Sequence, residues 1–221
     1  LGSKLPYNIN ASMRMLYNPQ LKGAYNFVPG VMAMILLLVS TMMTSISVVR
    51  EKENGTMEIL LASPLRPILI IIAKAIPYLL LSMVNIGTIL LLSVFALDLP
   101  IAGSLGLLLA TSMLFTITAL SLGLLISTLT ASQQIAMLIS LVGMFLPTLM
   151  LSGFMFPIEN MPIPLQVMSN IIPAKWYFII VKSIMIKGLG ITAIWKETLI
   201  LTVMTIGLIA LTARKFKIRL E

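Results

Sequence analysis

Residues 28–49 read VPGVMAMILLLVSTMMTSISVV, and this apolar stretch decides the fold. A helix rises about 1.5 Å per residue, so a stretch of this length crosses a hydrocarbon core of about 30 Å. The stretch stops at the charged run Arg50-Glu51-Lys52-Glu53, where water must begin. The sequence therefore predicts that residues 28–49 span a membrane as one helix.

Further apolar runs of similar length follow along the chain. Turn signals at Asp98-Leu99-Pro100 and at Thr130–Gln134 separate them, so the third and fourth runs are expected to form a tight hairpin. We predict an all-α membrane protein with about five transmembrane helices. The expected spans are about 28–49, 68–97, 101–129, 135–156 and 191–213, within a transmembrane domain at 28–213.

The composition excludes most soluble functions. Hydrophobic residues make up 59% of the chain and charged residues 10%, whereas soluble domains carry roughly 45–50% and about 25%. The absence of cysteine and histidine excludes disulfides, Cys/His zinc sites and Ser-His or Cys-His catalytic pairs. The net charge of +8 comes mostly from scattered Lys and Arg at segment ends. That distribution favours anionic lipid headgroups over nucleic acid as a partner.

The basic tail at 214–221 sets the expected orientation. It contains Arg214, Lys215, Lys217 and Arg219, and the positive-inside rule predicts that such a cluster beside a span is cytoplasmic. Five crossings then place the polar residues 1–27 outside. A count of all the cations, those of the tail included, gives almost no bias, so the orientation depends on the density of the tail cluster beside a span. No signal peptide is recognised, and a chain opening at Leu1 is expected to be a fragment.

The connector at 50–67, REKENGTMEILLASPLRP, joins the first two spans. Thr56 is placed to cap a helix N-terminus, and Glu58 lies in the first turn, where it meets the positive end of the helix dipole. Apolar residues recur along one face: Met57, Leu60, Leu61 and Leu65. Such a helix could be a handle pushed by a partner or an amphipathic connector on the membrane surface. The pattern alone leaves both open.

The segment at 157–176 is rich in proline and carries charge, which predicts a structured loop. The apolar stretch at 177–186 is too short to cross a membrane, so we expect a re-entrant or interfacial external segment. Trp176, Tyr177 and Trp195 are interpreted as anchors at the membrane interface.

A few polar residues and prolines lie near or within the predicted spans. Asn85, Gln133 and Gln134 are expected to form interhelical hydrogen bonds or to lie at an interface rather than to contact substrate. Pro77 and Pro147 are expected to kink their helices, with a gating hinge as the alternative.

Two segments resemble a known family. Arg50-Glu51-Lys52-Glu53-Asn54-Gly55-Thr56-Met57-Glu58, then Leu60-Leu61 and Ser63-Pro64-Leu65, resembles the R-E-(K/R)-E-x-G-T-x-E…L-L-x-(S/T)-P-(L/I) stretch of ABC-2 type permeases. These are membrane subunits of ATP-binding-cassette exporters. Pro157-Ile158-Glu159-Asn160-Met161-Pro162, with Pro173, Tyr177 and Lys187-Gly188, resembles the outer-leaflet loop before the last span. The resemblance runs from about Tyr25 to the C-terminus and implies the multidrug-export type, of which the first span and most of an external domain are missing here. Residues 1–27 would then be the end of that extracytoplasmic domain or a linker.

The resemblance also implies partners and site residues. The segment around Thr56–Ser63 would be a coupling helix seated on a separate ATP-binding cassette subunit. The implied coupling residues are Arg50, Glu51, Glu53, Gly55, Thr56, Glu58, Leu61 and Pro64. The implied external-loop residues are Pro157, Glu159, Pro162 and Pro173. A second permease copy, in a homo- or heterodimer, and membrane lipid are the other expected partners.

The expected function is that of a permease subunit in the plasma, or inner, membrane. It would couple ATP hydrolysis by the separate subunit to export of an amphipathic, drug-like or lipid-like substrate. The chain has no G-x-x-x-x-G-K-[ST], so ATP and magnesium are expected on the partner, and no cofactor, metal or catalytic residue on this chain. The alternatives are a non-transporting scaffold or assembly protein and an intramembrane enzyme. An enzyme would need Ser-Lys chemistry, and Lys74 and Lys182 have no evident serine partner.

Overall fold

The computed structural model describes residues 17–18, 20, 22–56, 67–99 and 101–218 of the 221-residue chain. The described residues form helices and turns without a strand among them, which confirms the predicted all-α class. The elements are α1 (Ala24–Glu53), α3 (Pro67–Phe95), α4 (Leu105–Leu129), α5 (Gln133–Leu151), η1 (Ile158–Asn160), α6 (Ile163–Ser169), α7 (Pro173–Met185) and α8 (Ile191–Ile218).

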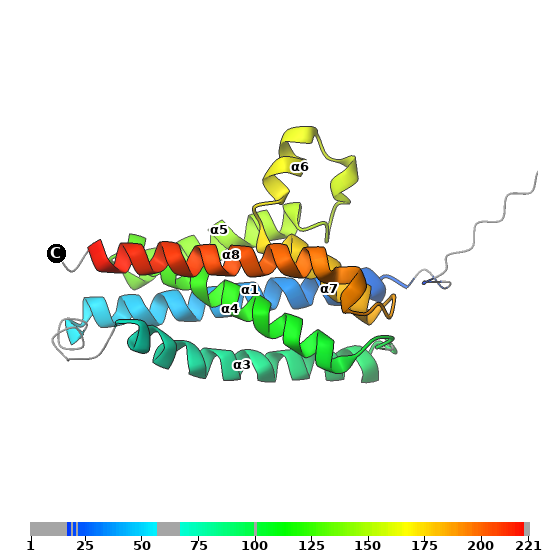
Figure 1. Ribbon diagram of the computed structural model, residues 1–221, viewed down its shortest axis with the longest axis horizontal. Helices are drawn as coiled ribbons and strands as arrows, with labels where there is room; N and C mark the ends of the chain where they lie inside the picture. Colours follow the sequence, from blue (N-terminus) through cyan, green and yellow to red (C-terminus); the bar gives the residue numbers. More distant parts are fainter. Residues whose placement is uncertain (1–16, 19, 21, 57–66, 100, 219–221) are drawn as a thin grey trace, which may run out of the picture.

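Five of the described helices are long and apolar enough to cross a membrane: α1, α3, α4, α5 and α8. They run roughly along one common axis (Figure 1), so the chain is a multi-pass membrane protein, as predicted. We call the two ends of this bundle the Glu53 end, where α1 finishes, and the Lys187 end, where α7 finishes. Helices α1, α4 and α8 start at the Lys187 end, whereas α3 and α5 start at the Glu53 end (Figure 1).

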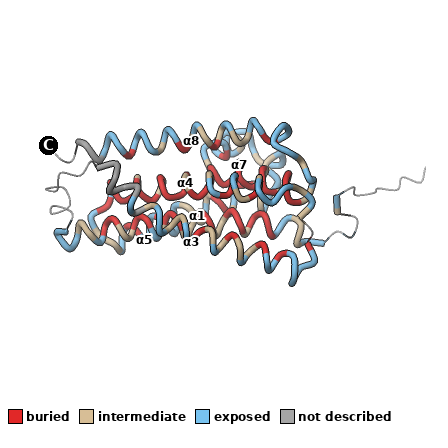
Figure 2. Tube along the Cα trace, turned by 60° about the horizontal axis from the view of Figure 1, so that its bottom comes forward, coloured by how far each residue is buried: buried red, intermediate tan, exposed pale blue. Residues whose placement is uncertain are grey.

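Helices α1 and α4 form the interior of the bundle. Half of the apolar window of α1 and 61% of that of α4 are buried, against 22% for α3 and 17% for α5 and α8. Figure 2 shows the same contrast, with buried residues concentrated on α1, α4 and α7. Helices α3, α5 and α8 therefore turn most of their apolar residues outward, as expected for surfaces that meet lipid or another membrane subunit.

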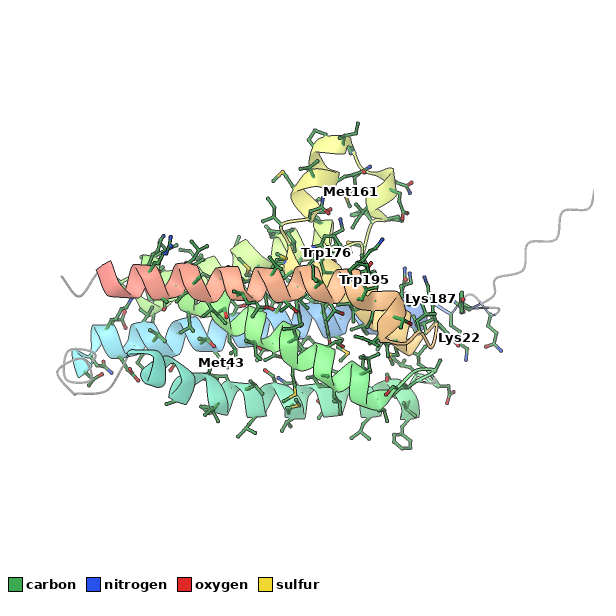
Figure 3. The ribbon with its side chains drawn as sticks, in the orientation of Figure 1. Lys22, Met43, Met161, Trp176, Lys187 and Trp195 are labelled. Carbon is green, nitrogen blue, oxygen red and sulfur yellow. The ribbon has the colours of Figure 1, made fainter. Side chains whose placement is uncertain are left out.

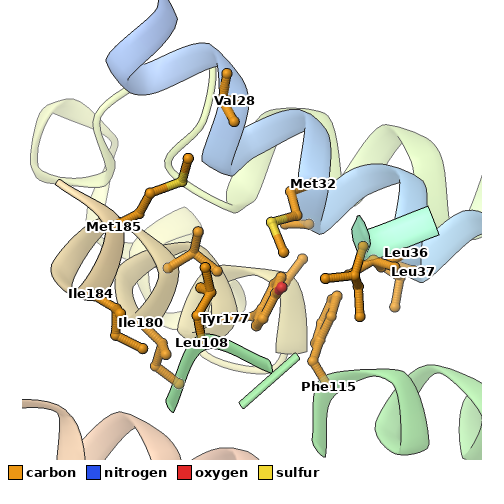
Figure 4. Packing of buried hydrophobic residues seen from close by; sticks show 14 of the residues in the cluster. Val28, Met32, Leu36, Leu37, Leu108, Phe115, Tyr177, Ile180, Ile184 and Met185 are labelled. Atoms are coloured by element: carbon orange, nitrogen blue, oxygen red, sulfur yellow. The ribbon is translucent and has the colours of Figure 1, made fainter. Parts of the chain in front are cut away.

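The short helix α7 fills the interior at the Lys187 end. It packs against α1, α4 and α8, and its Tyr177 is fully buried beside Met32, Leu36 and Phe115 (Figure 4). The Tyr177 ring stacks on Phe115, with 4.1 Å between the ring centroids and 3° between the planes. The interpretation of Tyr177 as an interfacial anchor is therefore wrong, because α4 supplies both a stacking ring and a hydroxyl partner for it.

Two other aromatic residues remain near the surface at this level. The Trp195 side chain is 54% exposed, and the indole of Trp176 donates a hydrogen bond to the carbonyl of Asn170. Residues 157–172, which contain η1 and α6, protrude from the bundle, and we call them the α6 hairpin. Figure 3 places both tryptophans between this hairpin and the cations Lys22 and Lys187. This arrangement agrees with an aromatic belt lying just inside a layer of charge.

Hydroxyl groups join the helices inside the bundle. In α1, Ser40 lies 3.0 Å from Ser82 of α3, Thr41 donates to the Ala119 carbonyl of α4, and Ser45 lies 2.8 Å from Ser140 of α5. Between α4 and α8, Thr118 and Thr205 lie 2.6 Å apart. Such bonds are each worth about 0.6 kcal/mol on average in a membrane. Because the partners come from different helices, the bonds set the helix register as well as contributing stability.

The helix limits differ from the predicted spans at two turns. Helix α4 begins at Leu105 rather than near 101, because Ala102 donates its backbone N–H to the Met185 carbonyl at the end of α7. Gly103 allows this approach, since a Cβ there would lie 2.4 Å from the Ile184 carbonyl oxygen. Helix α5 ends at Leu151, before the predicted limit of 156, and Gly153 turns the chain with a φ of 84°.

Candidate functional site

The first candidate site is the Glu53 end of α1, where the coupling motif begins. Arg50, Gly55 and Thr56 are exposed here. Gly55 has a φ of 69°, a left-handed conformation that favours glycine and ends the helix. The Thr56 hydroxyl donates to the Glu51 carbonyl at 3.2 Å. The helix that Thr56 was predicted to cap lies outside the described residues, as do Glu58, Leu61 and Pro64.

Glu53 contacts the start of α5. Its Oε1 accepts a hydrogen bond from the backbone N–H of Gln133 at 2.8 Å, and its Oε2 accepts one from the Gln133 side-chain amide. Ser132, at the N-cap position of α5, makes no side-chain capping bond. The first N–H groups of a helix have no partner within that helix, so Glu53 provides the missing acceptor and places a negative charge at the positive end of the α5 dipole. The prediction of an interhelical bond is confirmed for Gln133.

Lys52 contacts the end of α4. Its ammonium group donates a hydrogen bond to the carbonyl of Ser127, which lies in the last turn of that helix. The final carbonyls of a helix lack intrahelical donors and carry partial negative charge. We call the contacts of Glu53 with Gln133 and of Lys52 with Ser127 the polar clasp. It joins the Glu53 ends of α1, α4 and α5.

The predicted external-loop residues lie around η1 and α6. Pro157 precedes η1, Pro162 precedes α6, and Pro173 is the buried first residue of α7. Glu159 is exposed within η1. Since proline has no N–H, it is well suited to the first positions of helices, and these three prolines mark where the short elements begin.

Hydrogen bonds hold the α6 hairpin against α7. The Lys175 ammonium donates to the Ser169 hydroxyl at 3.0 Å and to the Asn170 side-chain oxygen at 2.6 Å, and burial lowers the pKa of Lys175.

A second lysine of α7 contacts α1. The Lys182 ammonium donates to the side-chain oxygen of Asn26 at 2.6 Å. Burial lowers the pKa of Lys182, and repulsion from Lys187 adds to that effect.

The second candidate site is an apolar groove of about 540 Å³ between α5 and the α6 hairpin. The residues that line it are Leu37, Leu122, Gly143, Met144, Leu146, Pro147, Thr148, Met150, Leu151, Leu165, Met168, Ile171, Ile172 and Pro173. Half of these residues come from the part of α5 nearer the Lys187 end.

Two polar groups interrupt the apolar lining of the groove. The Thr148 hydroxyl is buried and has no hydrogen-bond partner among the described residues. Pro147 has no N–H, so the carbonyl of Gly143, one turn earlier, lacks its usual helical donor. A largely apolar pocket with a few polar groups is typical of sites that bind small amphipathic molecules. Sequence reasoning identified Pro147 but not the groove, which forms only when the α6 hairpin folds against α5.

The described residues contain no cluster of three or more acidic, histidine or cysteine side chains that could hold a metal ion. The charged groups in the described part of the chain lie mainly at the two ends of the bundle.

Comparisons with known proteins point in one direction. A family model described as "ABC-2 family transporter protein" matches residues 3–214. The chain is 36% identical over 213 residues to the Escherichia coli K12 protein named "Probable multidrug ABC transporter permease YbhS", covering 96% of this chain and 56% of the relative. It is 33% identical over 203 residues to "Inner membrane transport permease YhhJ" of the same strain, covering 90% of this chain and 53% of the relative.

A eukaryotic relative also matches. "ABC transporter G family member 20" of Dictyostelium discoideum is 30% identical over 174 residues, which cover 79% of this chain and 24% of the relative. The chain spans about half the length of the bacterial relatives described above. No solved structure matches the chain significantly.

Proposed function

The chain belongs to the ABC-2 family of transporter proteins, and on that premise we propose that it is part of the membrane permease of an ATP-driven exporter in the inner membrane. One observation carries the proposal. The coupling motif at the end of α1 is joined by the polar clasp to α5, the helix that supplies half of the residues lining the groove. A site for a motor and a site for a substrate are thus connected through one helix.

The motor is a separate ATP-binding cassette subunit, which binds ATP and magnesium. It contacts the connector at 50–67, whose Arg50, Gly55 and Thr56 are exposed at the Glu53 end. This end is cytoplasmic in the proposal, as the basic tail beside α8 suggests. Closure of two ATP-binding subunits then moves the helices as rigid bodies and changes access to the groove from one side of the membrane to the other.

The substrate is an amphipathic molecule, drug-like or lipid-like. The apolar lining of the groove favours a hydrophobic body, and the Gly143 carbonyl, which lacks its helical donor, offers an acceptor to a polar end. The groove lies toward the Lys187 end, which is the external side in this orientation. The word "multidrug" in the name of the YbhS relative agrees with such a substrate class.

A second permease copy covers part of the exposed surface of α5. Ile135, Leu138 and Val142 of α5 are each more than half exposed. Because only 17% of the apolar window of α5 is buried within one chain, this helix has room for a partner. Lipid covers the remaining outward faces of α3 and α8.

Substrate-dependent ATPase activity tests this proposal. The full-length permease is reconstituted in vesicles with its ATP-binding subunit, and ATP hydrolysis is measured with increasing rhodamine 6G, an amphipathic dye. A transporter changes its rate with the dye. A scaffold or assembly protein binds the subunit without any dye-dependent change, so a flat response from a panel of amphipathic compounds would refute export.

A further inference from the structure

The polar clasp leaves α5 dependent on α1 for the position of its first turn. Ser132 does not cap α5 with its side chain, and the acceptor for the first N–H of the helix comes from Glu53, 80 residues earlier in the chain. The Gln133 amide bonds the second carboxylate oxygen of the same residue. Two bonds to one carboxylate fix the direction as well as the position of the contact.

Helix α5 packs mainly on α1, with smaller contacts to α4, α6 and α7. Its burial within the chain is the lowest among the spanning helices, together with that of α8. Farther along α5 from the polar clasp, the Ser140 hydroxyl forms a hydrogen bond with Ser45 of α1. Because a helix transmits displacement along its axis, movement at Gln133 reaches the groove residues from Gly143 to Leu151.

The position of Glu53 also separates two roles within the charged motif. Arg50, Glu53, Gly55 and Thr56 are all exposed, but the Glu53 carboxylate accepts hydrogen bonds from α5 of its own chain. Lys52 strengthens the same junction by binding the last turn of α4. The resemblance implied that Glu53 contacts the ATP-binding subunit, but the geometry gives its carboxylate an intramolecular partner.

We propose that Glu53 is a positioning residue that transmits movement of the connector to α5 and thereby to the groove, instead of binding the ATP-binding subunit. This inference rests on the proposed function, since it assumes that the connector is moved by a motor. It assigns the transmission step to Glu53 and the partner contact to the other exposed residues of the motif.

The natural absence of cysteine allows a direct test. Glu53→Gln and Glu53→Cys/Gln133→Cys are made in the full-length permease and purified with the ATP-binding subunit. We expect both to retain the subunit and its basal ATPase rate. Stimulation by rhodamine 6G should fall about fivefold or more, a typical size for lost coupling between sites. Bridging the two cysteines with a short bifunctional thiol reagent should restore stimulation, and a reductant should remove it again.

Asp98→Asn is the matched control. Asp98 is an exposed carboxylate at the Lys187 end, with a φ of 48° that asparagine also tolerates, so this variant removes the same charge without touching the clasp. It should behave like the wild type. Loss of the ATP-binding subunit from Glu53→Gln would overturn the inference, because the carboxylate would then be a partner contact. A bridged double-cysteine variant that keeps the ATP-binding subunit but regains no dye-stimulated ATPase activity would overturn the inference as well.

Hydrogen exchange distinguishes failure of this inference from failure of the export proposal. If the ATPase rate of the wild-type complex responds to no amphipathic compound, the export proposal is refuted. The positioning role of Glu53 is then tested by hydrogen exchange in the full-length permease without its partner. Amides of the groove segment 143–151 should then exchange faster in Glu53→Gln than in the wild type, and bridging the double-cysteine variant should return them to the wild-type rate. Unchanged exchange would overturn the positioning role.

Discussion

The hydroxyl oxygens of Ser45 in α1 and Ser140 in α5 lie 2.8 Å apart in the interior of the bundle. This contact and the bond between Glu53 and Gln133 join the same two helices at two heights. Two separated contacts resist tilting of one helix against the other, so α1 and half of α5 should move together during transport.

A disulfide between these helices tests whether they move as one body. In Ser45→Cys/Ser140→Cys, oxidation should form a cross-link because the native side-chain atoms already touch. We expect the oxidised variant to keep substrate-stimulated ATPase activity within about twofold of its reduced form. Loss of stimulation that a reductant reverses would show that α1 and α5 must separate at this level.

Close packing of α1 against α4 requires a glycine. A Cβ at Gly123 would lie 2.5 Å from the Thr41 carbonyl oxygen and 2.9 Å from the Thr44 Cβ. Gly123→Ala should therefore lower the free energy of unfolding by about 1–3 kcal/mol, measured by thermal unfolding of the full-length protein in detergent. Gly207→Ala is the control, because no atom lies within 4 Å of its Cβ position. A Gly123 variant as stable as the Gly207 variant would contradict the packing.

The buried hydroxyl of Tyr177 should contribute less than its ring. Tyr177→Phe removes the 2.6 Å bond to Ser112 but keeps the stack on Phe115, so we expect a loss of about 1 kcal/mol. Tyr177→Ala also removes the ring from the core and should cost about 3–5 kcal/mol. Thermal unfolding measures both. Equal losses in the two variants would mean that the hydroxyl, and not the ring, dominates at this position.

Filling the groove should weaken the response to substrate. Leu146 lines the groove and is 49% exposed, whereas Leu199 is 55% exposed on α8 outside it. Leu146→Trp should raise the dye concentration needed for half-maximal ATPase stimulation by about tenfold, equivalent to about 1.4 kcal/mol. Leu199→Trp adds the same bulk to a lipid-facing surface and should leave that concentration unchanged. Equal effects of the two variants would argue against the groove as the substrate site.

Much of the helical fold could be predicted from local sequence. The length of the apolar run at 28–49 and the charges at Arg50–Glu53 are properties of consecutive residues, and they decide where α1 crosses and ends. The polar break predicted at Thr130–Gln134 likewise marks the separation of α4 from α5, although α5 already begins at Gln133. The short helix α7 was expected as a segment too short to cross, although its packing was not.

Tyr177 shows why the packing could not be predicted. Beside Trp176, a tyrosine fits the pattern of an interfacial belt. Its burial depends on Ser112 and Phe115, which lie on another helix and have no sequence relationship to it. The contact of Glu53 with Gln133 has the same origin, since 80 residues separate the two. The sequence identified Glu53 and Gln133 as candidate polar residues but could not predict that they contact each other.

Cysteine cross-linking of the connector to the ATP-binding subunit tests the central claim most directly. Single cysteines replace Glu58 or Leu61 in the full-length permease, which is then co-expressed with its ATP-binding subunit bearing cysteines near its surface groove. The account predicts specific cross-links from both positions, in a connector that reagents reach only from the cytoplasm. If neither position cross-links and both react only from outside the cell, the orientation is inverted and the exporter proposal is contradicted.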